Sequence, residues 1–464
     1  MAEKTPTQRL WQDALTGKIS RRDILIRGAA LGLSAPVLAA LAQESIRGTL
    51  AAEEGKPTAT FYDWELNLHP GIYDVGDAVG VTVEVAPTEN FGNDRFIAEA
   101  NDESSTWDMY GGVTPFLEML QLVETGTIEP WDAYVSDEDK NDLYPATLAE
   151  GSVDGSWYVW PLLLDICVQA SNAGILEKAG IDPEVAPVTW DEFISNAQKV
   201  QESGAAPYGL TFDNRDWRSL IPVTHSISTD VYTPDGLFRY NSDAAIEALE
   251  IMKRMMELTS ADILAASGVD NTVLVDQAAW AAEQAGYYFK YQNAPLTYSA
   301  TWADPSMLRL ARLPKTEAGV GGTVFWDTGA VLFKYGNNKP KMVELIQSIQ
   351  QDQTIWQNSV QGNADEGTTA VGQLPVTQST WANWEASPPD FVTENPWIFA
   401  VRDALADASA IAPSLLSIKQ FDVARPLWQK YLSGETADAA TAGQEAFDAV
   451  VAEYKAQTGT DPQV

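Results

Sequence analysis

The chain has 464 residues, with 65 acidic side chains against 29 lysines and arginines, and a formal net charge of −36 at pH 7. At about 100–200 residues per domain, this length predicts two or three domains with cores large enough to need no disulfide support. A charge of this sign repels polyanions and no stripe of basic residues offsets it, so we expect no nucleic-acid partner. The 16 tryptophans favour a surface that binds flat apolar faces, in addition to ordinary core packing.

The amino terminus resembles a twin-arginine signal peptide. Ser20-Arg21-Arg22-Asp23-Ile24-Leu25 precedes an apolar run from Ala29 to Ala42, which ends in small residues. The run is shorter than a membrane anchor and is typical of a cleaved export signal. We therefore expect residues 1–42 to be removed, residues 43–57 to form a flexible leader, and the protein to be periplasmic or at the extracellular face of the membrane. No cysteine stands at the cleavage point, so no lipid anchor is expected.

Strand and helix patterns alternate from Thr58 onward. Thr58–Trp64 and Val79–Val85 alternate and are rich in β-branched and aromatic residues, which predicts two strands with a short helix between them. Thr189 and Glu192 have the spacing of a capping box, which predicts a helix from there to about Gln201.

Three more helices are predicted farther along the chain. One follows Asn241-Ser242-Asp243 with an apolar stripe that includes several methionines, one is opened by Asn338-Lys339-Pro340, and the last covers Thr436–Lys455. Strands that alternate with helices over about 400 residues predict α/β lobes with mostly parallel sheets.

Motifs for metal binding or catalysis are not found. The two histidines, His69 and His225, have no partner at ligand spacing, which argues against a metal site or a catalytic triad. Asp137, Asp139 and Asn141 alternate like the start of a calcium loop, but the glycine and the bidentate glutamate that such a loop needs are missing. We therefore expect no metal and no cofactor.

Paired carboxylates leave one enzymatic alternative open. With 65 acidic residues, two could meet across a cleft as they do in glycosidases, so a secreted glycoside hydrolase is an alternative function. Cys167, the only cysteine, lies in the apolar stretch Pro161–Val168 and is expected to be a small buried side chain.

Five short motifs occur in the order that one protein family shows. They are Asp154–Pro161 (DGSWYVWP), Asn172–Leu176 (NAGIL), Lys178–Pro183 with Thr189–Phe193 (KAGIDP and TWDEF), Gly321-Gly322 before Phe325-Trp326, and Gly372–Val376 (GQLPV). On these motifs the chain resembles family 1 extracellular solute-binding proteins of ABC importers, of the maltodextrin-binding and sugar-binding type. The resemblance covers Thr58–Gly459 and implies a non-enzymatic, monomeric receptor that binds a di- or oligosaccharide and delivers it to membrane permease subunits.

The resemblance also implies the architecture. The expected fold is the α/β, two-lobed periplasmic-binding-protein fold, with the ligand in a cleft between lobes that close about a hinge. The hinge crossings are expected near Leu162–Cys167, near Leu308–Leu313 and near Ile349–Asp352. The first lobe then comprises residues 58–164 and 312–350, and the second lobe comprises residues 165–311 and 351–464.

Ligand-binding candidates follow from the order of elements in the family. A sugar presents hydroxyls at its edge and C–H groups on its faces, so a receptor needs polar and aromatic side chains. The candidates are Asp63, Trp64 and Glu65 at the end of the first strand; Tyr110, Gly111 and Thr114 in the loop after the third strand; Asp165; Arg215 and Trp217 in an aromatic loop of the second lobe; and Tyr291, Trp326, Asp327 and Phe421. Trp217 and Trp326 are expected to come from separate lobes and to stack on opposite parts of one ligand.

A different small solute, above all a polyamine, is the alternative within binding proteins. Its cations would need several carboxylates enclosed by aromatic rings. Asp63, Glu65, Asp165 and Asp327 could provide these carboxylates.

Overall fold

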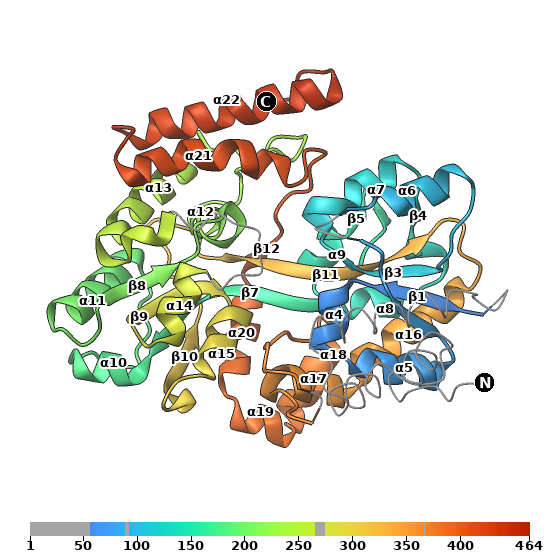
Figure 1. Ribbon diagram of the computed structural model, residues 1–464, viewed down its shortest axis with the longest axis horizontal. Helices are drawn as coiled ribbons and strands as arrows, with labels where there is room; N and C mark the ends of the chain where they lie inside the picture. The colour runs from blue at the N-terminus through green and yellow to red at the C-terminus, as the bar shows by residue number, and fades with distance from the viewer. Residues whose placement is uncertain (1–55, 89–91, 265–273, 366) are drawn as a thin grey trace, which may run out of the picture.

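The computed structural model describes residues 56–88, 92–264, 274–365 and 367–464. The expected signal segment and nearly all of the expected leader lie outside the described residues. Two α/β lobes lie side by side, and the long strands β7 (Trp160–Asn172) and β11 (Thr323–Phe333) run between them (Figure 1). Within the described ranges, no helix combines the length and the apolar character needed to cross a membrane.

The first lobe is built on three parallel strands in the order β2-β1-β3, with β11 antiparallel to β3. The opening β-α-β unit is confirmed, but the first strand ends earlier than predicted, at Phe61, and two helices follow it. Asp63 and the buried Glu65 lie in the first turn of the first of these helices. The elements are β1 (Thr58–Phe61), α4 (Asp63–Leu68), α5 (Gly71–Val79), β2 (Thr82–Val85), α6 (Asp94–Asn101), β3 (Met109–Val113), the π-helix η1 (Pro115–Met119), α7 (Leu120–Glu124), β4 (Ile128–Glu129), α8 (Asp137–Asn141), α9 (Pro145–Glu150) and α16 (Lys339–Gln351).

The second lobe surrounds β9, which pairs with β7 in antiparallel and with β8 in parallel orientation. Two predicted helix starts are confirmed: Thr189 and Glu192 form a capping box at α11, and Ser242 caps α13. The elements are α10 (Ala173–Lys178), α11 (Trp190–Glu202), β8 (Tyr208–Phe212), the 3₁₀ helix η3 (Asp216–Arg218), α12 (Leu220–His225), α13 (Asp243–Met255), α14 (Val275–Ala281), β9 (Ala285–Tyr291), α15 (Asn293–Ser299), β10 (Leu308–Ala311), α21 (Lys419–Ser433) and α22 (Ala439–Thr458).

Four helices near the end of the chain link the two lobes from below in Figure 1. α17 packs against α5 of the first lobe, whereas α20 packs against β10 and β7 on the second-lobe side. A two-residue strand, β12, then pairs with the start of β11 before the chain reaches α21 and α22. The elements are α17 (Gln353–Gln361), α18 (Gln378–Ala386), α19 (Asp390–Glu394), α20 (Trp397–Leu405) and β12 (Ala408–Ser409).

The chain passes between the lobes at positions that agree only partly with the sequence-based expectation. β7 pairs with β11 up to Ile166 and with β9 from Cys167 onward, inside the first expected crossing. The second expected crossing is wrong, because β10 pairs with the second-lobe end of β7 and the passage is made by β11 instead. The third lies beyond Asp352, because α17 still contacts the first lobe.

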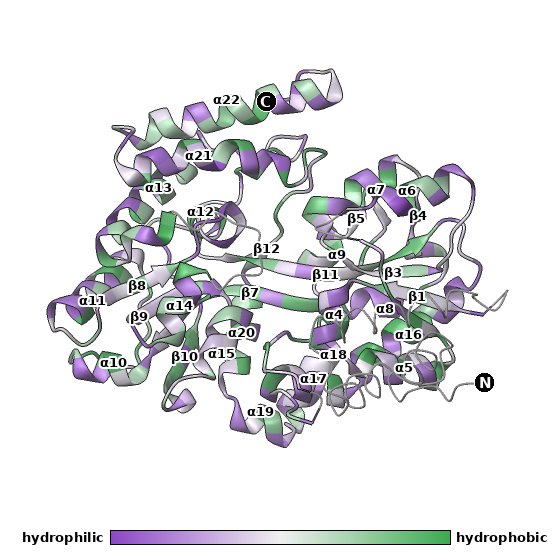
Figure 2. Cartoon of the chain, in the orientation of Figure 1, coloured by the Kyte–Doolittle hydropathy of each residue, from purple (hydrophilic) through white to green (hydrophobic). Residues whose placement is uncertain are grey.

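Packing explains the helices that the apolar stripes predicted. On α13, Leu249, Met252 and Met255 are completely buried, so these methionines fill the second-lobe core. Cys167 is also buried and has a free thiol. The strands β7 and β11 are largely hydrophobic, but hydrophilic residues interrupt them between the lobes (Figure 2). These interruptions include Asp165 on β7 and Asp327 on β11.

Candidate functional site

Five aromatic rings meet where the two lobes approach each other. Phe116 of η1, in the first lobe, lies 5.3 Å from Trp326 and 6.3 Å from Phe421, measured between ring centroids. Trp217 of η3 lies 5.2 Å from Phe421 of α21, and Tyr291 of β9 lies 6.0 Å from Trp326. We call these five residues the aromatic cluster. It brings together four sequence-predicted candidates and one ring, Phe116, that the sequence reasoning missed.

The two tryptophans contact each other rather than enclosing free space. Their ring centroids are 6.5 Å apart and their planes are inclined by 50°. A sugar ring between two indoles needs about 7–8 Å, twice an ordinary carbon–carbon contact distance. Insertion of a ligand between Trp217 and Trp326 therefore requires the two rings to move apart, and Trp326 lies on a crossing strand rather than in the body of the first lobe.

Four buried carboxyl groups lie around the crossing strands. Glu65 comes from α4, Glu150 from the end of α9, Asp165 from β7 and Asp327 from β11, and each is at most 3% exposed. Their charges interact: Glu65 is affected by Asp165 and Asp327, and Glu150 by Asp327. We call these four residues the carboxyl cluster.

Most oxygens of the carboxyl cluster have no hydrogen-bond partner in the described chain. Only Asp165 Oδ2 accepts bonds, from Gln373 Nε2 and Asn293 Nδ2, each at 3.2 Å. Two polar groups lie near these carboxyls without forming a hydrogen bond: the Leu162 amide near Asp327 and the Thr328 hydroxyl near Glu65. Each of them lowers the pKa of the carboxyl next to it. Buried polar atoms are normally paired, so these oxygens are suited to accept bonds from a ligand.

Burial determines the protonation of these carboxyl groups. Loss of solvent raises the pKa of Asp165 from 3.8 to about 7, against the opposing effects of Gln373, the Arg218 charge and Asn293. Burial likewise raises the pKa values of Glu65, Glu150 and Asp327 well above their ordinary range. This arrangement therefore favours neutral carboxyls, which can donate as well as accept hydrogen bonds.

Gln373 connects the carboxyl cluster to a histidine of the first lobe. Its Oε1 atom lies 2.6 Å from His69 Nε2, while its Nε2 atom donates to Asp165. Burial lowers the pKa of His69 to about 4, so the ring is neutral at pH 7 and donates through Nε2. Gln373 belongs to the GQLPV motif, and this motif is the feature of the sequence from which its place in the site could have been predicted.

The first-lobe candidates occupy different positions from those expected. Asp63, Trp64 and Glu65 begin α4 instead of ending β1, and Asp63 is exposed. Tyr110 and Gly111 lie within β3, not in a loop after it, because both are buried against the first-lobe core. A Cβ atom at Gly111 would lie 2.4 Å from the Phe61 ring. This residue therefore allows β1 and β3 to approach each other.

Thr114 does follow β3, as expected, and begins η1. Its backbone N–H donates to Glu118 Oε2 at 2.8 Å, which holds the start of the helix that carries Phe116. Burial raises the pKa of Glu118 to about 7. Thr114 thus positions a member of the aromatic cluster through the backbone.

Arg215 belongs to an ion network of the second lobe. Its Nε and Nη2 atoms donate to the two oxygens of Asp213, at 3.0 and 2.7 Å. Lys290 Nζ lies 2.8 Å from Asp213 and 2.6 Å from Asp276, and all three groups are almost fully buried. The nearby cations lower the pKa of Asp213 despite its burial. This network occupies the Arg215 guanidinium and gives it a structural role.

The sequence also matches a known protein family. A family model described as bacterial extracellular solute-binding protein matches residues 78–354, more than half of the chain. The chain belongs to this family. As a member of the bacterial extracellular solute-binding proteins, it can be compared with relatives whose structures are known.

Solved structures show the same two-lobed fold as this solute-binding protein. The cyclic α-maltosyl-1,6-maltose binding protein from Arthrobacter globiformis matches with a TM-score of 0.66 and 20% identity, over 86% of this chain and 99% of its own. The sugar-binding protein MalE from Xanthomonas citri matches with a TM-score of 0.68 and 17% identity, over 87% and 100% of the two chains.

Curated relatives match a smaller part of this solute-binding protein. A putative binding protein of Brucella abortus (strain 2308) is 23% identical over 301 residues, which are 62% of this chain and 66% of the relative. A probable amino-acid ABC transporter periplasmic-binding protein of Sinorhizobium fredii is 22% identical over 40% of this chain and 45% of its own. The chain thus spans just under two thirds of the first relative's length.

Proposed function

We propose that this solute-binding protein is the extracytoplasmic receptor of an ABC transporter, which binds a carbohydrate between its lobes and delivers it to the membrane permease. The aromatic cluster is the observation that carries this proposal. It joins Phe116 of the first lobe to Trp217 and Phe421 of the second, next to Trp326 on a crossing strand. Aromatic faces bind the C–H faces of sugars, and the neighbouring carboxyl cluster offers partners for hydroxyl groups.

The comparisons support a sugar as the ligand class. Several structural neighbours are described with bound sugars, among them a cyclo/maltodextrin-binding protein with maltotetraose and a MalE3 of T. maritima with maltose. A di- or oligosaccharide would contact several rings at once. Its binding would favour the closed arrangement, because both lobes contribute contacts only when they are together.

Binding without chemical turnover is part of the proposal. The family consists of binding proteins, which supports a role for the carboxyl cluster in holding a ligand rather than in cleaving it. Incubation with the bound oligosaccharide followed by product analysis tests this point. Sustained release of smaller sugars would instead identify a hydrolase.

One observation favours a second candidate, a cationic solute such as a polyamine. Within the described chain, the carboxyl cluster forms no ion pair with a lysine or arginine. Bound ammonium groups would lower the pKa values of these carboxyls and pair with their ionised form, which a neutral sugar cannot do. The sugar remains our first choice because the aromatic cluster is large and the structural neighbours bind sugars.

A panel of melting temperatures separates the candidates. Maltose, maltotetraose, other di- and oligosaccharides, spermidine and putrescine should be tested on the mature protein, since a ligand that binds only the folded state raises the melting temperature. We expect a rise with at least one oligosaccharide. A response to polyamines alone would identify the second candidate, and no response to either class would contradict both.

A further inference from the structure

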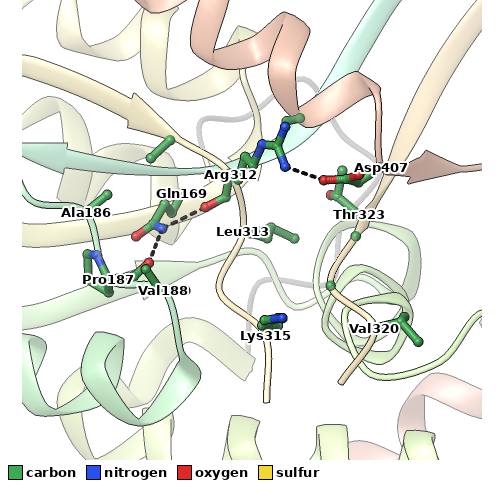
Figure 3. A pocket seen from close by; sticks show the side chains of 14 residues that line it. Gln169, Ala186, Pro187, Val188, Arg312, Leu313, Lys315, Val320, Thr323 and Asp407 are labelled. Atoms are coloured by element: carbon green, nitrogen blue, oxygen red, sulfur yellow. Dashed lines mark hydrogen bonds and ion pairs between the residues drawn. The ribbon is translucent and has the colours of Figure 1, made fainter. Parts of the chain in front are cut away.

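A cavity of about 370 Å³ lies on the second lobe, apart from the interlobe site (Figure 3). Gln169 of β7 and three further segments line it: residues 186–188 before α11, residues 311–313, 315 and 320–323 from the end of β10 to the start of β11, and Ala404 at the end of α20 with Asp407 just after it. None of its lining residues belongs to the aromatic cluster or the carboxyl cluster. Its volume lies within the range of about 300–1,000 Å³ that is usual for small-molecule sites.

A buried glutamine holds the walls of this cavity together. Gln169 of β7, only 4% exposed, donates from Nε2 to the carbonyl oxygens of Pro187 and Arg312, each at 2.7 Å. These two bonds attach both loops to the same strand, as the dashed lines in Figure 3 show. These two walls of the cavity are therefore held in place without a ligand.

The walls are apolar and unusually exposed. Pro187, Val188, Leu313 and Val320 contribute hydrophobic surface to the cavity. Val188 is 62% exposed and Val320 is 69% exposed, and they are two of the few large hydrophobic residues at the surface of the described chain. Exposed apolar surface around a cavity favours an occupant with an apolar body.

The charges at the cavity favour an anion. Arg312 and Asp407 form an ion pair across the loops. Lys315 forms no ion pair within the part of the chain that the structure describes, and Figure 3 places it on the other side of Leu313 from that pair. The lining of this cavity thus carries one more positive than negative charge, in a chain whose net charge is −36. Lys315 also lines an adjoining cavity together with the acidic residues Asp191, Glu247, Glu250 and Glu317. An anion is therefore favoured only in the first cavity, on the Leu313 side.

We propose that this cavity is a second ligand site, which binds a small amphipathic carboxylate. Its apolar body would lie against Pro187, Val188 and Val320, and its carboxylate would pair with the Lys315 ammonium. Such a ligand would make apolar contacts and one charge-assisted hydrogen bond in the same cavity. A neutral sugar lacks the negative charge, and a polyamine carries the opposite charge, so neither meets both requirements. The inference is independent of the proposed interlobe function, because the two sites share no residue.

Octanoate is a suitable probe, with octanamide as its uncharged counterpart. Binding should be measured by isothermal titration calorimetry and by saturation-transfer NMR on the mature protein and three variants. Lys315→Met removes the ammonium and keeps much of the length of the side chain. Lys199→Met is a matched control, since Lys199 is an exposed residue of α11 in the same lobe. Trp326→Ala alters the interlobe site only.

We expect millimolar or tighter binding of octanoate to the wild type and to Lys199→Met and Trp326→Ala. Lys315→Met should weaken it roughly tenfold, the size of one charge-assisted contact, and octanamide should bind the wild type as weakly as octanoate binds that variant. Absence of octanoate binding to the wild type would overturn the proposal. Equal binding of the amide, an unchanged Kd in Lys315→Met, or loss of binding in Trp326→Ala would each overturn it as well.

Discussion

Trp326 on β11 lies directly opposite Asp165 on β7 in the antiparallel ladder that joins the two lobes. Directly paired residues project from the same face of a sheet, so an aromatic ring and a carboxyl group are adjacent at the point where the chain crosses. A sugar needs this combination, a flat apolar surface for its face and an oxygen for its hydroxyls. The crossing strands β7 and β11 therefore contribute side chains to the proposed ligand site and also connect the two lobes.

Trp326→Ala is expected to weaken ligand binding by about 2–4 kcal/mol, roughly 30- to 1,000-fold, because a central aromatic contact is lost. The effect on unfolding should be smaller, since this side chain is only partly buried. Trp190→Ala is the control: this ring is 1% exposed and packs on Phe193 and Phe289. It should lose about 3–5 kcal/mol of stability with little change in affinity. Calorimetric titration and urea unfolding of both variants measure the two quantities.

Trp217 differs from Trp326 in that it contributes to folding as well. It is 5% exposed, Arg425 stacks on its ring, and its carbonyl oxygen accepts a bond from the Tyr291 hydroxyl. Trp217→Ala should therefore lower both the affinity and the melting temperature. An affinity equal to that of the wild type would place the ligand away from the aromatic cluster.

Asp165→Asn is expected to change how stability depends on pH. The folded pKa of about 7 lies above the ordinary value of 3.8, so between these values the folded state holds a proton that the unfolded state has released. The contribution of Asp165 to the free energy of unfolding therefore falls as pH rises from about 4 to 7. The variant should gain stability relative to the wild type across this window. Urea unfolding at several pH values measures the difference, and a difference independent of pH would refute the argument.

Asp165→Asn must be compared with the wild type at each pH, because two buried histidines change the pH dependence of stability in the opposite direction. Burial lowers the pKa of His69 to about 4 and that of His225 to about 3. Each therefore makes the folded state more stable as pH rises toward 6.5. The difference between Asp165→Asn and the wild type cancels these contributions, which both proteins share.

Lys290→Met is expected to destabilise the second lobe by about 3–5 kcal/mol. It removes the cation that pairs with the buried Asp276 and one of the cations that pair with Asp213. Arg254→Met is the control, since its ion pair with Asp191 is exposed and should contribute less than about 1 kcal/mol. Thermal unfolding of both variants provides the measurement. Similar effects of the two substitutions would mean that the buried network contributes little.

Gly111→Ala is expected to destabilise the first lobe by about 1–3 kcal/mol, because the added Cβ atom would meet the Phe61 ring in a packed core. Gly174→Ala is the control. At that position, the nearest atoms to a Cβ would be at ordinary contact distances of 3.4 Å and more. We expect a fall in melting temperature for Gly111→Ala only. Equal melting temperatures of Gly111→Ala and the wild type would show that β1 and β3 can move apart without cost.

Local chemistry in the sequence was sufficient for many of the elements. Thr189 with Glu192, and Ser242 before α13, satisfy free backbone N–H groups within one turn, so their helices begin where the spacing predicts. The buried methionines of α13 follow from helical periodicity. The motif order identified the family for the same reason, since each motif is a contiguous run of residues.

Only the tertiary structure decided which residues share the interlobe site. Phe116 joins Trp326 across more than 200 positions of the sequence. Glu150 comes near Asp327, and Gln373 donates to Asp165, through strand pairing and helix packing rather than local spacing. The crossing assigned to Leu308–Leu313 failed because the pattern of a short strand does not reveal its partner, and β10 paired with β7. Sequence by itself determined which local elements form and which family they belong to. Contacts between distant segments determined the site, because a side chain's partners depend on how the elements pack.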